Sequence, residues 1–202
     1  IKWTKEQDKL AVFVLNRNQN RLDMIYSHPK SLVSKLILRD EDKYYVDFEN
    51  IDDVNFSDDG KFFTFVSERN GWRHAYLYNV NGTLQKQLTL GNFDVTKVYG
   101  YDDVKQTLYY QSTENSPLQR DVYSVDTKGK KTLLTDGKGT HSAVFSATYA
   151  YFSDNASSLN KPNITYMRNS KGEILRILED NATLMAEFNA LNLPKKEFFS
   201  LV

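Results

Sequence analysis

The sequence predicts an all-β fold: about four four-stranded antiparallel meanders, each one blade of a β-propeller, followed by a short C-terminal helix. The first observation is a pattern that recurs four times, in which an apolar or aromatic entry precedes three strand-like runs separated by polar turns. The copies align on Trp3, Phe56, Tyr101 and Phe145, which lie 53, 45 and 44 residues apart, at or just above the period of a propeller blade. The second observation is the aromatic content of 13%, because Tyr and Phe favour strands.

The second copy carries the pattern most clearly. A Ser-Asp-Asp-Gly turn that ends at Gly60 precedes an apolar run over residues 61–67, and Asn70-Gly71 then gives a strong signal for a tight hairpin turn. An alternating run over residues 74–80 and a closing run over residues 83–89 complete the four strands. If the turn at Asn70-Gly71 is of type I′, both of its central residues take a positive φ.

The other copies follow the same plan with local irregularities. Their inner strands are expected at residues 10–15, 22–26 and 36–38, at residues 107–112, 122–125 and 131–135, and at residues 149–153, 164–167 and 174–178. Pro162 is expected just before a strand, where its missing N–H removes no ladder hydrogen bond. The blades therefore occupy residues 1–180.

Residues 181–202 follow a different pattern. Asp180 or Asn181 can cap a helix from about Ala182 to Leu191, and Pro194 ends it. The apolar face of this helix consists of Leu184, Met185, Phe188 and Leu191. Residues 196–202 are expected to form an extended strand. Because that strand has no partner left in the sequence, we expect the chain to stop where a second domain begins.

Composition excludes several classes of function. Lys plus Arg and Asp plus Glu number 26 each, so no bulk field attracts nucleic acid or an anionic membrane. No run approaches the roughly 18 apolar residues that a membrane-spanning helix needs, and no signal peptide opens the chain.

The first residue is Ile1 rather than Met, so we expect the chain to begin inside a larger protein. Cysteine is absent, which excludes disulfides, thiolate metal sites and cysteine nucleophiles.

The sequence offers no catalytic, cofactor-binding or metal-binding residue set. A Gly-x-Ser-x-Gly nucleophile segment is missing, and so are phosphate-loop and dinucleotide fingerprints. His74, at the start of a strand, and His141, just before one, are expected to be hydrogen-bonded structural residues, and His28 to be solvated. The acidic pairs at residues 52–53, 58–59 and 102–103 lie in predicted turns, where carboxylates usually bind their own backbone. We therefore expect no bound cofactor and no metal ion.

Aromatic residues near the expected strand ends have two possible uses. A ligand platform is one, but burial between blades is the more frequent use and is favoured here. The residues concerned are Tyr44, Tyr45, Trp72, Tyr99 and Tyr101.

Several longer segments resemble one family. They are residues 56–62, the run Ser67-Glu-Arg-Asn-Gly-Trp-Arg-His-Ala-Tyr-Leu-Tyr, residues 87–96, residues 109–123 and the run Leu175-Arg-Ile-Leu-Glu-Asp-Asn. In this order they closely resemble the N-terminal β-propeller of dipeptidyl peptidase IV and its prolyl oligopeptidase-type relatives, over nearly the whole chain. The resemblance implies the last four or so blades of an eight-bladed propeller, and residues 194–200 resemble the passage into an α/β-hydrolase domain.

The resemblance also implies a function. The chain would be a non-catalytic part of a periplasmic or extracellular bacterial serine exopeptidase that releases dipeptides with Pro or Ala second. It would control peptide access to the missing hydrolase domain and support substrate binding and the parent protein's homodimer. A substrate-facing Phe-Arg pair of the family is not carried over, because Phe48 is followed by Glu49. The substrate-binding residues therefore stay unassigned, and no residue of this chain is expected to be catalytic.

A second hypothesis comes from a different class. Many unrelated propellers bind a protein or peptide through their loops without any catalytic domain, so a free-standing propeller module is the alternative. A Gly-x-Ser-x-Gly segment about 100 to 200 residues beyond residue 202, as the usual size of a domain implies, would distinguish the two.

Overall fold

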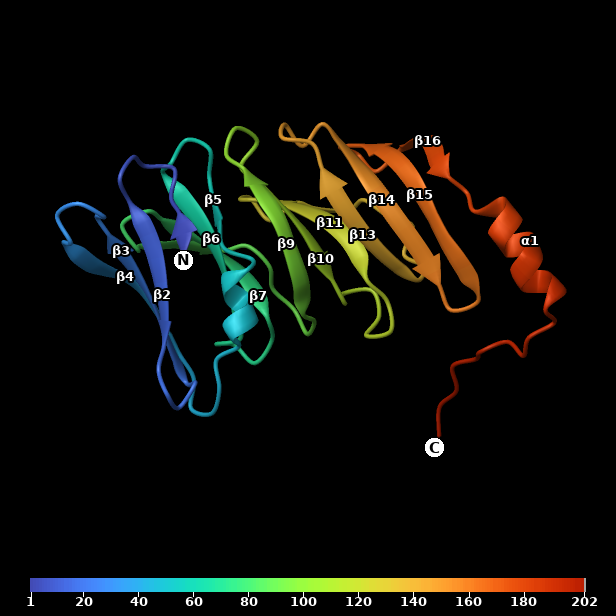
Figure 1. The fold of residues 1–202 in the computed structure, drawn as a ribbon, viewed down its shortest axis with the longest axis horizontal. Coiled ribbons are helices and arrows are strands. Elements are labelled where there is room, and N and C mark those ends of the chain that lie inside the picture. The colour runs from blue at the N-terminus through green and yellow to red at the C-terminus, as the bar shows by residue number, and fades with distance from the viewer. Residues whose placement is uncertain (202) are drawn as a thin grey trace. The chain divides into compact units, whose positions relative to one another are not determined.

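A computed structural model describes residues 1–201. In this part of the chain the strands form four four-stranded sheets, and within each sheet the strands lie side by side in sequence order (Figure 1). The all-β prediction with four meanders is therefore confirmed. The chain divides into two compact units, residues 1–110 with 124–131, and residues 111–123 with 132–202.

The first two sheets belong to the first unit. The first sheet contains β1 (Lys2–Trp3), β2 (Leu10–Leu15), β3 (Arg21–Ser27) and β4 (Ser34–Glu41). A 3-10 turn, η1 (Phe48–Ile51), leads to the second sheet, which contains β5 (Asn55–Phe56), β6 (Phe62–Ser67), β7 (His74–Asn79) and β8 (Leu84–Gln87). The pairings from β1 to β4 and from β5 to β8 are antiparallel.

The third and fourth sheets complete the repeats. The third contains β9 (Val95–Asp102), β10 (Thr107–Ser112), β11 (Asp121–Asp126) and β12 (Lys131–Leu133). The fourth contains β13 (Thr140–Phe145), β14 (Tyr151–Ser158), β15 (Lys161–Asn169) and β16 (Ile174–Glu179), and α1 (Ala182–Ala190) follows it. All the inner strands expected from the sequence are present at these places.

Alternation of apolar residues builds the core of the first unit. In β3, Leu22, Met24 and Tyr26 point to the same face and are buried, as the two-residue period of a strand requires. They belong to one apolar cluster with side chains of the second sheet, in which Phe63 stacks on Tyr78 with ring centroids 5.2 Å apart. Burial of these large side chains is the main favourable term for this unit.

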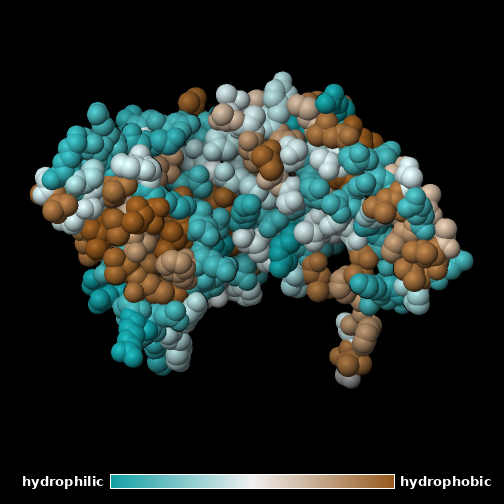
Figure 2. Space-filling model, viewed as in Figure 1, coloured by the Kyte–Doolittle hydropathy of each residue, from teal (hydrophilic) through white to brown (hydrophobic). Residues whose placement is uncertain are grey.

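Apolar side chains also remain on the surface. Figure 2 shows hydrophobic residues gathered over β2 and over α1. Val14 and Tyr151 are exposed, whereas Val12 and Ile164 are partly buried. Every residue of β16 is exposed, although four of its six residues are Ile or Leu. No helix within residues 1–201 is long and apolar enough to span a membrane.

The structure corrects three local expectations. Pro162 lies inside β15 rather than before it, and it is tolerated because the pairing with β14 is shifted between Ala156 and Ser158, at a bulge. His141 lies inside β13 rather than before it. At the hairpin turn only Gly71 has a positive φ, of 85°, and its N–H donates to the carbonyl oxygen of Glu68. The turn is therefore not of type I′.

The C-terminal segment differs from the prediction in one respect. Helix α1 is present, and the N–H of Ala182 donates to Asp180 rather than to Asn181, whose side chain makes no capping bond. Residues 194–201 form no strand; Val202 lies outside the described residues. Instead, Lys196 exchanges two backbone hydrogen bonds with the side chain of Asn160, at 2.9 and 3.0 Å. The side chain of Asn160 thus holds this extended segment at Lys196.

Candidate functional site

A cluster of buried charged side chains lies in the second unit. Three of its members come from neighbouring strands of the fourth sheet: His141 from β13, Asp154 from β14 and Arg168 from β15. In the register of this sheet Asp154 lies opposite Ala143, two residues along from His141, so the imidazole and the carboxylate meet diagonally. All three side chains are buried.

The first half of the cluster is an ordered chain of ion pairs. The Nδ1 atom of His141 lies 2.9 Å from Oδ1 of Asp154, and Nε of Arg168 donates to Oδ2 of the same carboxylate at 2.8 Å. Arg168 Nη1 also donates to the carbonyl oxygen of Gly172. The carboxylate of Asp154 therefore fixes the orientation of the imidazole, and Arg168 balances its charge.

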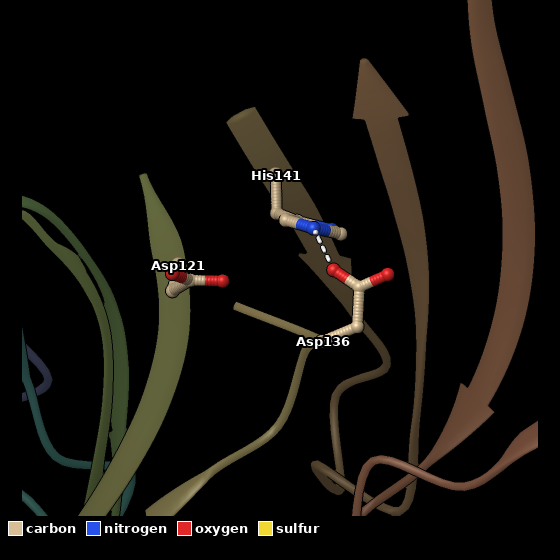
Figure 3. A group of neighbouring side chains, drawn as sticks. All are labelled: Asp121, Asp136 and His141. Atoms are coloured by element: carbon tan, nitrogen blue, oxygen red, sulfur yellow. Dashed lines mark hydrogen bonds and ion pairs between the residues drawn. The ribbon is translucent and has the colours of Figure 1, made fainter. Parts of the chain in front are cut away.

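The second half faces the turn between β12 and β13. Nε2 of His141 lies 2.9 Å from Oδ1 of Asp136 (Figure 3). It also lies 3.1 Å from the carbonyl oxygen of Lys138. Burial lowers the pKa of His141, but the adjacent carboxylates of Asp154 and Asp136 outweigh it, so the pKa lies above its ordinary value. Asp136 itself is mostly exposed.

Asp121 completes the cluster from the first position of β11. Its Oδ1 accepts hydrogen bonds from the hydroxyl of Thr135 at 2.7 Å and from the N–H of Gly137 at 3.1 Å. The side chain is fully buried, yet within residues 1–201 its Oδ2 has no hydrogen-bond partner. One carboxylate oxygen points toward His141 and Asp136 (Figure 3). One ligand-type atom from each of Asp121, Asp136 and His141 lies within 4.8 Å of the others.

The arrangement of hydrogen bonds that holds Asp121 in the third repeat also occurs in the second repeat. In the second repeat His74 is the first residue of β7, and the hydroxyl of Thr89 lies 3.1 Å from its Nδ1 and accepts the N–H of Ala75. In the third repeat the hydroxyl of Thr135 meets Asp121 and accepts the N–H of Val122 in the same way. In both repeats a Leu-Thr segment, Leu88-Thr89 or Leu134-Thr135, thus fixes the first residue of the third strand.

Both ring nitrogens of His74 are hydrogen-bonded, as expected from the sequence, and so are both ring nitrogens of His141. Nε2 of His74 donates to the carbonyl oxygen of Gly91 at 3.0 Å, which leaves Nδ1 to accept from the hydroxyl of Thr89. Burial lowers the pKa of His74, and the Gly91 carbonyl and the charge of Asp94 offset only part of this effect. His74 is therefore a neutral, fully bonded core residue.

Some of the carboxylates in the acidic pairs bind the backbone of their own turns, and Asp53 binds residues outside its turn. Asp59 accepts from Lys61 and Asp102 from Lys105, as expected for turn carboxylates. Asp53, however, binds the guanidinium of Arg73 at 2.7 Å and the N–H of Val98 at 3.0 Å. The sequence predicted only a turn at Asp53, whereas the structure shows that Asp53 forms a buried ion pair with Arg73.

The aromatic residues divide into two groups. Tyr101 is buried, as predicted. Burial is the wrong expectation for Tyr44, Tyr45 and Trp72, which are 77%, 50% and 40% exposed, because they lie in loops outside the strand ladders. Tyr99 is partly exposed. The exposed members lie on the loop surface of the first unit.

The second unit also contains a wide groove. Its volume is about 1210 Å³, and residues of α1, of the following segment, of the β14–β15 turn and of the loop before β11 line it. Asn160 lies in this lining and makes the two hydrogen bonds to Lys196 that hold the C-terminal segment. The groove is therefore lined both by loops of the third and fourth repeats and by the segment that follows the repeats.

Comparisons with known proteins agree with the repeat architecture. A family model for the dipeptidyl peptidase IV (DPP IV) N-terminal region matches residues 1–163. A probable dipeptidyl peptidase 4 of Trichophyton verrucosum is 31% identical over 215 residues, an alignment that covers 100% of this chain and 28% of that protein. The dipeptidyl peptidase 4 of Trichophyton rubrum is 30% identical, with 100% of this chain and 27% of that protein covered.

Two crystal structures are similar in fold. The chain matches the dipeptidyl peptidase 4 of Porphyromonas gingivalis with a TM-score of 0.89 and 46% identity, covering 93% of this chain and 27% of that one. It matches a putative dipeptidyl aminopeptidase IV of Bacteroides ovatus with a TM-score of 0.76 at 20% identity, a likeness of fold alone, over 89% of this chain and 28% of that one. The chain thus spans little more than a quarter of these relatives. With its four sequential sheets and a family match over residues 1–163, the chain belongs to the N-terminal region of the dipeptidyl peptidase IV family.

Proposed function

We propose that this chain is a non-catalytic part of the β-propeller of a serine exopeptidase that releases X-Pro or X-Ala dipeptides from peptide N-termini. The observation that carries the proposal is the family match over residues 1–163 in a chain that contains no Gly-x-Ser-x-Gly segment. Residues 1–180 would supply blades, and residues 181–202 would lead toward an α/β-hydrolase domain.

The physical role of the blades is to cover the hydrolase site. Rigid sheets with buried cores exclude bulk water and folded proteins, whereas a flexible peptide end can enter between them. The exposed aromatic side chains of Tyr44, Tyr45 and Trp72 support this role, because loops at strand ends are where a propeller meets its ligands. The parent protein would be a homodimer in the periplasm or outside the cell, as the family resemblance implies.

Two measurements test the proposal. The intact parent protein should cleave a Gly-Pro chromogenic amide, and should cleave an unfolded peptide with the same N-terminus far faster than a folded protein that carries it. The 202-residue chain alone should cleave neither, because nucleophile, base and oxyanion donors belong to the other domain. Activity of the isolated chain that a point substitution within residues 1–202 abolishes would contradict the proposal.

A further measurement separates the two function classes. The reading frame of the parent protein should contain a Gly-x-Ser-x-Gly segment about 100 to 200 residues beyond residue 202. A frame without it would favour the free-standing binding module. Sedimentation of the parent protein tests the homodimer, and cell fractionation tests its location.

A further inference from the structure

We propose that Asp121, Asp136 and His141 bind a divalent transition-metal cation such as Zn²⁺. The three side chains come from β11, from the turn after β12 and from β13, and one ligand atom of each lies within 4.8 Å of the others. One imidazole nitrogen and two carboxylates are ligands that Zn²⁺ uses in proteins. Asp136 is mostly exposed, and its Oδ1 faces Nε2 of His141 at 2.9 Å, so an ion that replaced the proton between these two atoms would contact both.

The orientation of His141 supports a metal site. Metal-binding histidines usually donate their other ring N–H to a carboxylate, which fixes the tautomer and raises the basicity of the ligating nitrogen. Asp154 accepts from Nδ1 of His141 at 2.9 Å and is itself held by Arg168 at 2.8 Å. Nε2 therefore faces Asp136 with its lone pair available for an ion once its proton leaves.

Asp121 provides an independent observation. Asp121 is fully buried, and its Oδ1 accepts two hydrogen bonds while its Oδ2 has no partner within residues 1–201. A buried carboxylate whose charge no cation offsets is costly. Within the described chain, residues 1–201, no ion pair of Asp121 with Lys, Arg or His is present. One oxygen of the Asp121 carboxylate points toward His141 and Asp136 (Figure 3), and a cation held among the three residues would offset its charge.

The charges of the cluster are compatible with a dication. Asp154 is paired with Arg168, and when His141 binds an ion as a neutral ligand, the charges that remain are those of Asp121 and Asp136. A bound ion of charge two cancels them.

The ligand types select the class of ion. Ca²⁺ prefers six to eight oxygen ligands and Mg²⁺ keeps an all-oxygen octahedron, so an imidazole ligand favours a transition metal instead. Three protein ligands leave a fourth position for water or for the carbonyl oxygen of Lys138, which lies 3.1 Å from Nε2. Such an ion would tie the start of β11 to the start of β13 and stabilise the second unit.

The experiment measures metal binding directly and needs no enzymatic activity. The intact protein that carries this chain is stripped with a chelator and titrated with Zn²⁺ by calorimetry and with Co²⁺ by visible absorption, which reports coordination geometry. The test variant is Asp136→Asn, because the exposed Asp136 contributes little to the core. The matched control is Glu187→Gln, an exposed acidic residue of α1 in the same unit.

We expect the Asp136→Asn variant to bind Zn²⁺ at this site at least about 10-fold more weakly than the parent, and the control to bind it unchanged. Zn²⁺ should also raise the melting temperature of the parent and the control more than that of Asp136→Asn. Equal Zn²⁺ affinity in Asp136→Asn and the control, or no Zn²⁺ binding by correctly folded parent protein, would overturn the proposal. A response of this site to Ca²⁺ but not to Zn²⁺ or Co²⁺ would overturn the choice of metal class.

Discussion

Arg73 donates from Nη2 to Oδ2 of Asp53 at 2.7 Å, and both side chains are almost fully buried. The same guanidinium donates from Nε to Asn50 of η1 and from Nη1 to the carbonyl oxygen of Val95 at the start of β9. One side chain therefore joins the loop before β5, the entry to β7 and the first residue of β9 in a single polar network within the first unit.

The Arg73→Met substitution should destabilise the chain strongly. It keeps the apolar stem but leaves the buried carboxylate of Asp53 without its cation, and breaking a buried ion pair in this way costs about 3 to 5 kcal/mol. Urea unfolding followed by circular dichroism measures the change. The control is Lys61→Met, which removes an exposed ion pair with Asp59 and should cost at most about 1 kcal/mol. Equal losses in the two variants would show that the Arg73 network adds no stability.

Two glycines with positive φ should respond differently to alanine. Gly71 has a φ of 85° and open space where a Cβ would stand, so Gly71→Ala should cost only the backbone strain of about 1 to 2 kcal/mol. Gly82 has a φ of 93°, and its Cβ would stand 2.0 Å from the carbonyl oxygen of Ile37 in β4. Gly82→Ala should therefore cost about 1 to 3 kcal/mol more than Gly71→Ala. Thermal melts of the two variants that coincide would mean that the β7–β8 turn can move away from β4.

The stability of the first unit should depend on pH through His74. Because the pKa of His74 is lowered in the folded chain, the unfolded state binds a proton first as the pH falls. The contribution of His74 is fully present well above the ordinary histidine pKa of about 6.5 and declines as the pH drops through that value. His74→Gln should flatten this decline, as measured by unfolding at pH 8, 7, 6 and 5. A difference between parent and variant that is constant over this range would contradict the prediction.

The exposed apolar strand β16 should make the isolated chain self-associate. It is an edge strand of the fourth sheet, and its side chains, including Leu175 and Ile177, are about half exposed. Such an edge readily pairs with a second copy of the same chain. The double substitution Leu175→Lys and Ile177→Lys should lower the mass measured by light scattering, whereas Val104→Lys, at an exposed apolar residue of the β9–β10 turn, should not. A monomeric parent chain would contradict the prediction.

The strands could be predicted from the sequence alone, but the cluster of charged side chains around His141 could not. Turn residues and alternation, as in Leu22, Met24 and Tyr26, are local signals, and a blade is made of local hairpins. The type of the turn at Gly71 and the bulge at Pro162 depend on backbone geometry that residue types do not determine. Residues 194–201 form no strand, because strand pairing depends on a neighbouring strand and not on the local sequence alone.

The cluster around His141 escaped prediction because its members are far apart in sequence and follow no metal-binding spacing. Asp121, Asp136 and His141 meet only because the Leu-Thr segment returns the chain from β12 to the start of β11. The recurrence of that segment after β8 and β12 was a signal in the sequence. This recurrence predicts that Asp121 occupies in the third repeat the position that His74 occupies in the second, beside a threonine hydroxyl.

The Leu-Thr segment binds the backbone of the third strand independently of the side chain that begins this strand. The threonine hydroxyl and the leucine N–H hold the backbone of the third strand in both repeats, whichever side chain begins that strand. The first residue is then free to be an imidazole in one blade and a carboxylate in the next, with no change in strand register. The chemistry of a blade can therefore change at this one position, while the backbone hydrogen bonds that hold the strand stay the same.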